Sequence, residues 1–491
     1  MNMNDLFYSE DKKSIIGVVD KRIQHVTIPT SIESIGDEAF KGCTRLRSIF
    51  IPKQITSIGK RAFHDCRWLK EIVVDENNPN YRSIEGVLFS KDSTKIFYCA
   101  KLISSYIIPE SVVSIEYGAF MGCWSLKSIK IPRNVERIED NAFWGCDSLE
   151  QIEMPDNLKS IGENSFSMCS SLKQIRIPSK VEYIANNAFC GCDLMKEIIV
   201  DRDNNTFCSI EGVLYDKNIT KLLRMPGGKE CANYIIPKSV EIIGEYAFER
   251  CKRLETIVFP KGLFSINKGA FVGCTSLRWI NFPDKLEYIG NYAFNMCSSL
   301  HRIKMCNNVT YIGNNAFSFC SSLIHVSLSE LITKLSDGIF CTCRKLRHIK
   351  LPKALISIGN EAFADCISLQ EILLPDRITN IGNNAFENCE SIKNINITDN
   401  VVTIGARAFN LCKSLKFLEI SGNVMNIGQK AFVCNNLKEL HCRILDINNS
   451  IVDDIFSEVI FNKCILYIPR EAKEIYKNHP IFGKFEHIEI E

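Results

Sequence analysis

The sequence predicts a repeat solenoid, α/β or mostly β, in which short coils stack side by side and share one interior. Three observations predict it: a phenylalanine recurs every 23 residues, several other columns keep the same period, and each unit contains one short segment with strand periodicity. At 491 residues the chain is also too long for one ordinary globular core. We therefore expect an elongated core that runs through all of the units.

The repeat is defined by fifteen phenylalanines, and twelve of their fourteen intervals are 23 residues long. They are Phe40, Phe63, Phe120, Phe143, Phe166, Phe189, Phe248, Phe271, Phe294, Phe317, Phe340, Phe363, Phe386, Phe409 and Phe432. An aliphatic residue lies eight positions before each Phe, and Ile, or once Leu335, lies five positions before it, in most units followed by Gly. Glycine at this turn suggests a backbone with positive φ.

A cysteine follows each of these phenylalanines by three residues, or by two in the last unit (Cys434), so fifteen of the 23 cysteines form one column. We expect them to be buried structural thiols, because a small apolar side chain with a weak S–H donor suits a tight turn. Disulfides between neighbouring units are the alternative, but every cysteine would then have two equivalent partners. A zinc site is a weaker alternative, since no Cys-x-x-Cys pair is present.

Each unit also contains a segment of the form Leu-x-x-Ile-x-Ile, often closed by proline, as in Leu126 to Pro132. Its final alternation predicts a half-buried strand. One such strand cannot bury its own apolar face, but equivalent strands of neighbouring units can pair into a parallel sheet.

With these columns the chain resembles the BspA-like class of leucine-rich repeats, whose unit reads approximately Val-x-x-Ile-Gly-x-x-Ala-Phe-x-x-Cys-x-x-Leu-x-x-Ile-x-Ile-Pro. The resemblance extends from about Ile32 to Leu440. It implies a leucine-rich-repeat right-handed superhelix or horseshoe whose parallel strands offer a face for binding. It also implies a bacterial or protist surface protein that binds host proteins or other cells.

The two long intervals contain similar inserts, 83–109 and 209–237. In the first, Val87 to Phe89, a polar turn and residues 94–97 predict a protruding β-hairpin on a modified repeat. After Phe432 the pattern decays into a predicted helix over 451–461, a strand over 465–469, a short helix over 470–478 and a segment over 485–490, which would cap the stack. The predicted organisation is an N-terminal hairpin cap (1–30), repeats 1 and 2 (31–74), a hairpin insert (75–110), repeats 3 to 6 (111–200), a second insert (201–238), repeats 7 to 15 (239–442) and a C-terminal cap (443–491).

The sequence offers no chemistry for catalysis. It lacks a phosphate-binding glycine loop, a nucleophile elbow, a zinc-ligand helix and a kinase signature, so we expect a non-enzymatic protein without cofactor or metal. The formal charge of +2, from 59 basic and 57 acidic residues, does not favour nucleic acid as a partner. No apolar run approaches the roughly 20 residues of a transmembrane helix, and the N-terminus carries no apolar leader.

The outward positions of each predicted strand lie seven, eight and ten residues after Phe, and they carry fifteen basic against eight acidic side chains. Four consecutive units concentrate these charges in what we call the basic patch: Arg278, Trp279, His301, Arg302, Lys304, His325, Arg347, His348 and Lys350. We interpret the basic patch as an anion-binding site with Trp279 as an anchor. Alternatively, the long basic side chains only solvate the sheet, or His325 and His348 supply two ligands to a metal.

These observations predict a monomeric macromolecule-binding scaffold, a cell-surface or secreted adhesion protein by resemblance, that recognises a host or neighbouring-cell protein or an anionic glycan. The alternative is an intracellular interaction or regulatory protein. The many thiols and the missing leader favour that alternative.

Overall fold

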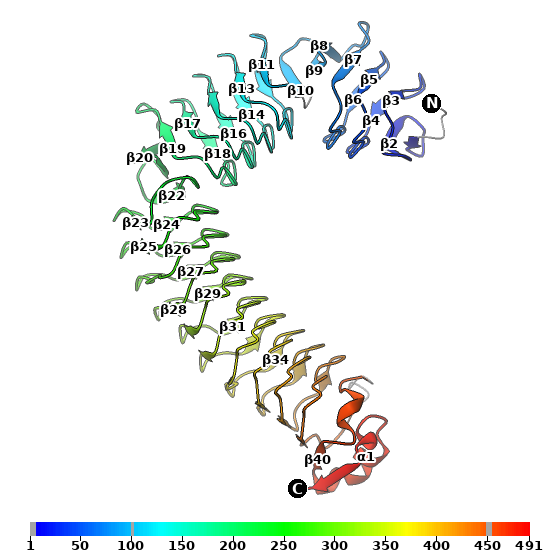
Figure 1. The fold of residues 1–491 in the computed structure, drawn as a ribbon, viewed down its shortest axis with the longest axis vertical. Helices are drawn as coiled ribbons and strands as arrows, with labels where there is room; N and C mark the ends of the chain where they lie inside the picture. The colour runs from blue at the N-terminus through cyan, green and yellow to red at the C-terminus, as the bar shows by residue number, and fades with distance from the viewer. Residues whose placement is uncertain (1–5, 100–102, 448–453) are drawn as a thin grey trace. The chain divides into compact units, whose positions relative to one another are not determined.

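A computed structural model describes residues 6–99, 103–447 and 454–491. The chain divides into two compact units. Unit 1 comprises Met1–Ile219 with Leu223–Lys229, and unit 2 comprises Thr220–Leu222 with Glu230–Glu491. Within each unit the backbone forms consecutive coils that stack on one another (Figure 1). Among the described residues, none of the helices has the length and apolar character needed to cross a membrane.

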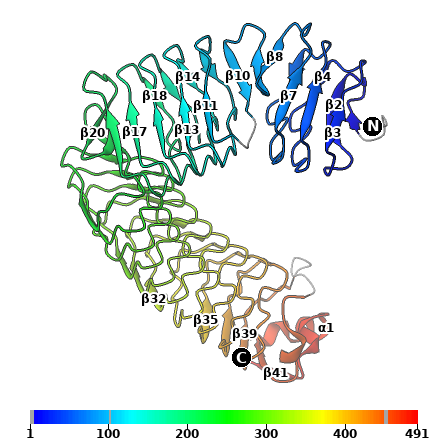
Figure 2. The same cartoon turned by 45° about the horizontal axis from the view of Figure 1, so that its top comes forward.

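One side of each unit is built from the strands that the sequence predicts, and the outward surface of these strands is called the strand face. All pairings within these groups are parallel. In unit 1 the groups are β3 (His25–Thr27), β5 (Ser48–Ile51) and β7 (Glu71–Val74); β11 (Ser105–Ile107), β13 (Ser128–Lys130) and β15 (Gln151–Glu153); and β17 (Gln174–Ile177) with β19 (Glu197–Val200). In unit 2 they are β23 (Asn233–Ile235) with β25 (Thr256–Val258); β28 (Arg302–Lys304), β30 (His325–Ser327) and β32 (His348–Lys350); and β35 (Asn394–Ile397), β37 (Phe417–Ile420), β39 (Glu439–Cys442), β40 (Ile465–Ile468) and β41 (His487–Ile490). Figure 2 shows β32, β35 and β39 along one side of unit 2.

A second ladder of mostly two-residue strands runs through each unit at the Ile column that precedes Phe. In unit 1 it comprises β2 (Ser14–Val18), β4 (Ser34–Ile35) and β6 (Ser57–Ile58), then β10 (Lys95–Tyr98), β12 (Ser114–Ile115), β14 (Arg137–Ile138), β16 (Ser160–Ile161) and β18 (Tyr183–Ile184). In unit 2 it begins with Lys221 and Leu222, the first two residues of β22 (Lys221–Arg224), which pair with β24 (Ile242–Ile243). It continues with β26 (Ser265–Ile266), β27 (Tyr288–Ile289) and β29 (Tyr311–Ile312), and with β31 (Lys334–Leu335), β33 (Ser357–Ile358), β34 (Asn380–Ile381), β36 (Thr403–Ile404) and β38 (Asn426–Ile427). The sequence predicts only one strand per coil, because two residues are too few to show a period.

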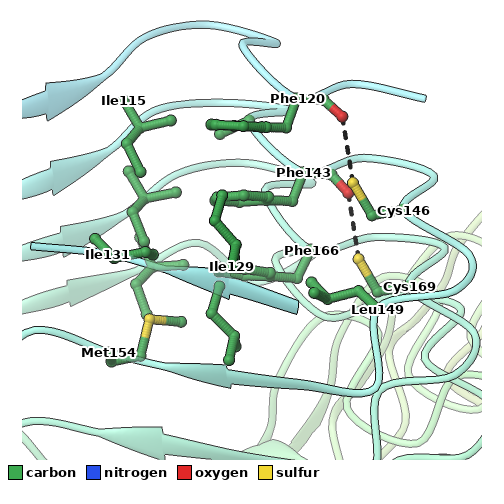
Figure 3. Packing of buried hydrophobic residues seen from close by; sticks show 14 of the residues in the cluster. Ile115, Phe120, Ile129, Ile131, Phe143, Cys146, Leu149, Met154, Phe166 and Cys169 are labelled. Atoms are coloured by element: carbon green, nitrogen blue, oxygen red, sulfur yellow. Dashed lines mark hydrogen bonds between the residues drawn. The ribbon is translucent and has the colours of Figure 1, made fainter. Parts of the chain in front are cut away.

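The interior of each unit is organised by stacked phenylalanine rings. Phe120, Phe143 and Phe166 are buried, with ring centroids 5.0 and 5.2 Å apart and planes tilted by 7° and 6° (Figure 3). Unit 2 has an equivalent stack of its own, from Phe248 to Phe432. Each ring contacts the ring before and after it, so one coil's core is completed only by its neighbours.

The cysteine column forms a hydrogen-bonded ladder beside these rings. The Cys146 thiol donates to the carbonyl oxygen of Phe120 at 3.2 Å, and Cys169 makes the same bond to Phe143 at 3.2 Å (Figure 3). The column cysteines are buried free thiols, as predicted. Burial raises the pKa of Cys320 to about 12, which disfavours the reactive thiolate.

The expectation that the glycine column needs positive φ is wrong. Gly162 is not among the residues with positive φ; instead, a Cβ there would lie 2.6 Å from the backbone nitrogen of Asp140 in the preceding coil. Positive φ occurs two residues before and two after Phe, as at Asn141 (58°) and Gly145 (70°). At these positions the backbone N–H groups point along the stack: Asn141 donates to the carbonyl oxygen of Glu163 at 2.7 Å.

Side-chain amides and carboxylates add a ladder that the sequence did not predict. The Asp140 carboxylate accepts the backbone N–H of Glu163 at 2.7 Å. In unit 2 the Asn360 side chain accepts the backbone N–H of Asn383 at 2.8 Å. These bonds satisfy turn N–H groups, so the variable turn surface still carries a repeated structural function.

Both inserts contain the predicted β structure, but as part of the stack. In unit 1, β8 (Tyr81–Ile84) pairs antiparallel with β9 (Val87–Ser90), and β9 pairs antiparallel with β10. The first insert does not protrude: Leu88 faces the core that contains Phe40, whereas Val87 and Phe89 face the core that contains Phe120. Alternate residues of one strand are therefore buried on opposite sides. The second insert holds β20 (Phe207–Ile210), antiparallel to β21 (Val213–Asp216).

The ends of the stack carry atypical elements. At the N-terminal end, β1 (Leu6–Tyr8) pairs antiparallel with β2, while residues 1–5 of the predicted cap lie outside the described residues. The C-terminal elements are η2 (Glu458–Ile460), β40, η3 (Arg470–Ala472), α1 (Lys473–Asn478), η4 (Phe482–Lys484) and β41. The predicted strand at 465–469 and the helix over 470–478 are confirmed.

The predicted helix over 451–461 is wrong where it can be assessed. Residues 451–453 lie outside the described residues, and within residues 454–461 the only helical element is the three-residue 3₁₀ turn η2. Phe456 instead forms a parallel bridge with Phe432, so this segment continues the stack in an extended form.

Candidate binding surface on the strand face

All nine residues of the basic patch are exposed and lie on the strand face of unit 2. The parallel register of β28, β30 and β32 aligns Arg302, His325 and His348 in one row. A second row contains Lys304 and Lys350 with Ser327 between them. Because adjacent strands lie about 4.8 Å apart, the two lysine backbones are about 10 Å apart.

The alternation of burial fixes the direction of these side chains. In β28 and β32 the central isoleucines, Ile303 and Ile349, are buried, while the residues on either side are exposed. A buried aliphatic residue at the centre of each of these strands, Val326 in the case of β30, thus holds the charged side chains toward solvent. This is the half-buried strand that the sequence predicts.

Trp279 lies at one end of the basic patch, outside the regular ladder. Its rung forms only a single bridge, between Trp279 and Thr256. The indole is 55% exposed and stacks on His301, with centroids 5.8 Å apart and planes tilted by 22°. The Nδ1 atom of His301 bonds to the carbonyl oxygen of Ser299 at 2.6 Å, which orients the imidazole under the indole. Trp279 is therefore held in place while more than half of it is open to a partner.

His325 and His348 face each other on adjacent strands, with ring centroids 6.1 Å apart and planes tilted by 14°. This arrangement matches the column that the sequence predicts. Among the described residues no group of three or more His, Cys, Asp or Glu side chains is placed to hold a metal ion. The two imidazoles thus form a pair of aromatic, titratable side chains rather than a closed metal site.

Two of the five fixed positive charges have carboxylate partners. Arg278 lies 3.8 Å from Glu255 of the preceding rung, and Lys350 lies 3.2 Å from Glu330, which belongs to the turn after β30. Both pairs are solvent-exposed, and such pairs contribute about 0 to 1 kcal/mol. An incoming anion can therefore compete for either cation at low cost.

The remaining three fixed charges are Arg302, Lys304 and Arg347. Within the described part of the chain none of them forms an ion pair. Arg302 and Lys304 lie in one coil and Arg347 lies two coils further along, so their fields add at the surface. Chemically the arrangement is suited to an anionic ligand, because it presents guanidinium groups that match carboxylate or sulfate in bidentate geometry.

Sequence reasoning missed the next rung, which follows His348. Glu371 forms a single bridge with His348, and Leu373 is 76% exposed in the column of Lys304 and Lys350. The available signal was an apolar residue at an outward position that is polar in the three preceding units.

The fold and surface define a repeat solenoid of the leucine-rich type, a class whose members typically bind partners on an extended face. The chain matches the family described as BspA type leucine rich repeat region (6 copies) over residues 19–95, 90–211, 228–347 and 333–464. These ranges cover most of the sequence, and the protein belongs to this family.

Solved structures of bacterial leucine-rich repeat proteins resemble the chain. One from Eubacterium ventriosum is 24% identical, with a TM-score of 0.48, over 76% of this chain and 88% of that chain. One from Bacteroides ovatus is 26% identical, with a TM-score of 0.45, over 79% and 98%. A leucine rich cell surface protein from Faecalibacterium prausnitzii is 25% identical, with a TM-score of 0.41, over 84% and 92%. No curated protein matches the sequence.

Proposed function

We propose that the protein is a non-enzymatic binding scaffold of a bacterial surface, which recognises a host or neighbouring-cell protein or an anionic glycan through the basic patch. The observation that carries the proposal is the group Arg302, Lys304 and Arg347, three exposed cations without an ion pair among the described residues. Trp279, exposed and stacked, lies beside them. Because these cations form no ion pair among the described residues, no ion pair has to break when they engage a partner's anions.

The scaffold beneath the basic patch supports such a role. The rings of Phe271, Phe294, Phe317 and Phe340 form a continuous buried stack below these coils. Side chains on a packed parallel ladder are held at fixed spacings, which lowers the ordering cost of binding.

A surface location is compatible with the large number of thiols. Free cysteines are commoner in reducing compartments, but here the column cysteines are buried, and burial raises the pKa of Cys274 and Cys366 well above the ordinary thiol value. Such thiols remain protonated and react slowly. The alternative, an intracellular interaction protein, would be supported if fractionation of the source cell placed the protein away from its surface.

The experiment is a glycan and extracellular-matrix protein array at two salt concentrations. The exposed cations predict ligands whose binding falls steeply as salt rises, because the screening length is already about 8 Å at physiological ionic strength. The triple variant Arg302→Glu, Lys304→Glu and Arg347→Glu should lose these ligands.

A control variant with the same charge change carries Lys285→Glu, Lys334→Glu and Arg344→Glu, all exposed and off the strand face. It should bind normally. Equal loss in both variants would mean that net charge, rather than the basic patch, governs binding.

A further inference from the structure

The strand-face ladder is interrupted directly beside the basic patch. β32 connects to the next rung by one bridge, between His348 and Glu371, and residues 372–375 form no strand. The following strand, β35, pairs with β37 and not with this rung. The coil of Phe363 therefore carries the strand face without the hydrogen-bonded ladder found in β28, β30 and β32.

Two hollows open at this interruption. One, of about 330 Å³, lies on the side of β32 and is lined mainly by Ile349, Leu351, Leu374 and Pro375. The other, of about 680 Å³, lies on the side of β35. Leu373 lines both hollows. With 76% of its surface exposed, Leu373 is an apolar side chain without a covering partner.

The first hollow is continuous with the basic patch, since His348 and Lys350 form part of its wall. Lys353, also in the wall, adds a cation. Glu371 is the one carboxylate among the residues that line it. A partner that reaches from the basic patch into this hollow thus meets cations first and then an apolar floor.

The second hollow contains a polar group that needs a partner. The hydroxyl oxygen of Thr398 is buried and makes no hydrogen bond within the described residues, and Thr398 lines the hollow. A buried hydroxyl without a partner is uncommon. A bound backbone group could satisfy it.

The spacing of these features fits an extended polypeptide in a polyproline II conformation that crosses the strands. Lys304 and Lys350 lie two rungs apart, about 10 Å, which corresponds to about three residues of such a chain, and side chains three residues apart share one of its faces. Leu373 lies one rung further, which adds one or two residues. The fitting segment therefore has two acidic residues spaced by three, followed after one or two residues by an apolar side chain.

We propose that the basic patch and the hollow beside Leu373 form one site for an extended acidic peptide with an apolar anchor. The inference rests on the proposed function and narrows it to protein partners. Carboxylates would face Lys304 and Lys350, and the anchor would enter the hollow lined by Ile349 and Leu374. A polysulfated glycan provides the charge but no aliphatic side chain, so it would leave the hollow empty.

The test measures fluorescence anisotropy of the full chain with three probes. They are a labelled peptide containing Glu-Ser-Ser-Glu-Ser-Leu, the same peptide ending in Ser, and labelled dextran sulfate. The Leu peptide should bind at least about fivefold more tightly than the Ser peptide, as expected for burial of one aliphatic side chain. Leu373→Ser should remove that difference and leave the binding of the Ser peptide unchanged.

Two further variants sharpen the test. Glu371→Gln should tighten the binding of both peptides by removing the opposing carboxylate. Leu411→Ser, at an exposed leucine off the strand face, should preserve the difference between the peptides.

Equal affinities for the two peptides would overturn the inference. Binding of dextran sulfate without either peptide would also overturn it and leave the proposed function standing. Failure of all three probes would count against both.

Discussion

The cysteine ladder makes a quantitative prediction for Cys297, a column residue in the middle of unit 2. Its thiol donates to the carbonyl oxygen of Phe271 at 3.2 Å and is fully buried. Cys297→Ala removes the sulfur and leaves a void of about methyl size, which costs about 1 kcal/mol. Loss of a weak hydrogen bond adds about 0.5 kcal/mol, the low end of the usual range.

Together these losses predict that Cys297→Ala lowers the free energy of unfolding by about 1.5 kcal/mol. The substitution does not leave the Phe271 carbonyl without a partner, because this carbonyl also accepts the backbone N–H of Cys274 at 3.1 Å. The low value for the lost hydrogen bond is therefore the appropriate one. Cys297→Ser keeps a donor and most of the volume, so it should destabilise less than Ala.

The assay is urea unfolding under reducing conditions, followed by circular dichroism, with hydrogen exchange of the Phe294 coil as a local readout. Local readout is needed because long repeat arrays can unfold in parts. Cys306→Ala is the control: this half-buried thiol lies outside the column, 3.5 Å from the carbonyl of Leu286, and should change stability by less than about 0.5 kcal/mol. A Cys297→Ala protein as stable as the parent would refute a structural role for the thiol ladder.

Three further predictions concern stability and binding. Burial raises the pKa of Cys320 to about 12, and it also raises the pKa of the column thiols Cys297 and Cys343. The folded state therefore holds protons on these thiols that the unfolded state releases near the ordinary thiol pKa. Stability, measured as the urea midpoint, should be intact below pH about 8.5 and fall as pH rises toward 12, and a flat alkaline profile would contradict the buried column. Gly313→Ala should lower the free energy of unfolding by about 1 to 3 kcal/mol through overpacking, because its Cβ would meet the backbone nitrogen of Asn291. The control Gly262→Ala, at a position with open space around the Cβ, should leave the free energy of unfolding unchanged in the same assay. Replacing His301, His325 and His348 by Ala should weaken ligand binding, because His301 supports the exposed indole of Trp279 and His325 faces His348 on the strand face; unchanged affinity in that variant would remove the three histidines from the binding account.

Much of the fold follows from the period of the sequence. Fifteen phenylalanines at a fixed spacing require equivalent environments, and the stacked rings from Phe248 to Phe432 provide them. The strand positions could be predicted from period-two alternation, and Ile303 is buried between two exposed neighbours as that alternation predicts.

The features that were missed depend on contacts between coils rather than on local pattern. Glycine at position 162 reads locally as a turn residue, but its requirement is the backbone of Asp140 in the coil before it. The first insert was expected to protrude, yet Val87, Leu88 and Phe89 are all buried, because a strand placed between two cores is apolar on both faces.

The candidate site could be predicted in part. The register of His325 and His348 followed from the repeat. The pairing of Lys350 with Glu330 did not, because Glu330 lies in a turn outside the strand columns. The interruption after β32 has no periodic signature, since Glu371 to Leu374 retain the apolar positions of an ordinary strand.

The most direct test of the strand-face account is hydroxyl-radical footprinting of the protein alone and with a ligand captured on the array. Trp279 and His325, exposed on the strand face, should become protected, while Tyr288 and Tyr311, exposed on the second ladder, should react as before. Protection of the two tyrosines with Trp279 and His325 left reactive would show that the protein binds its partners through a different surface.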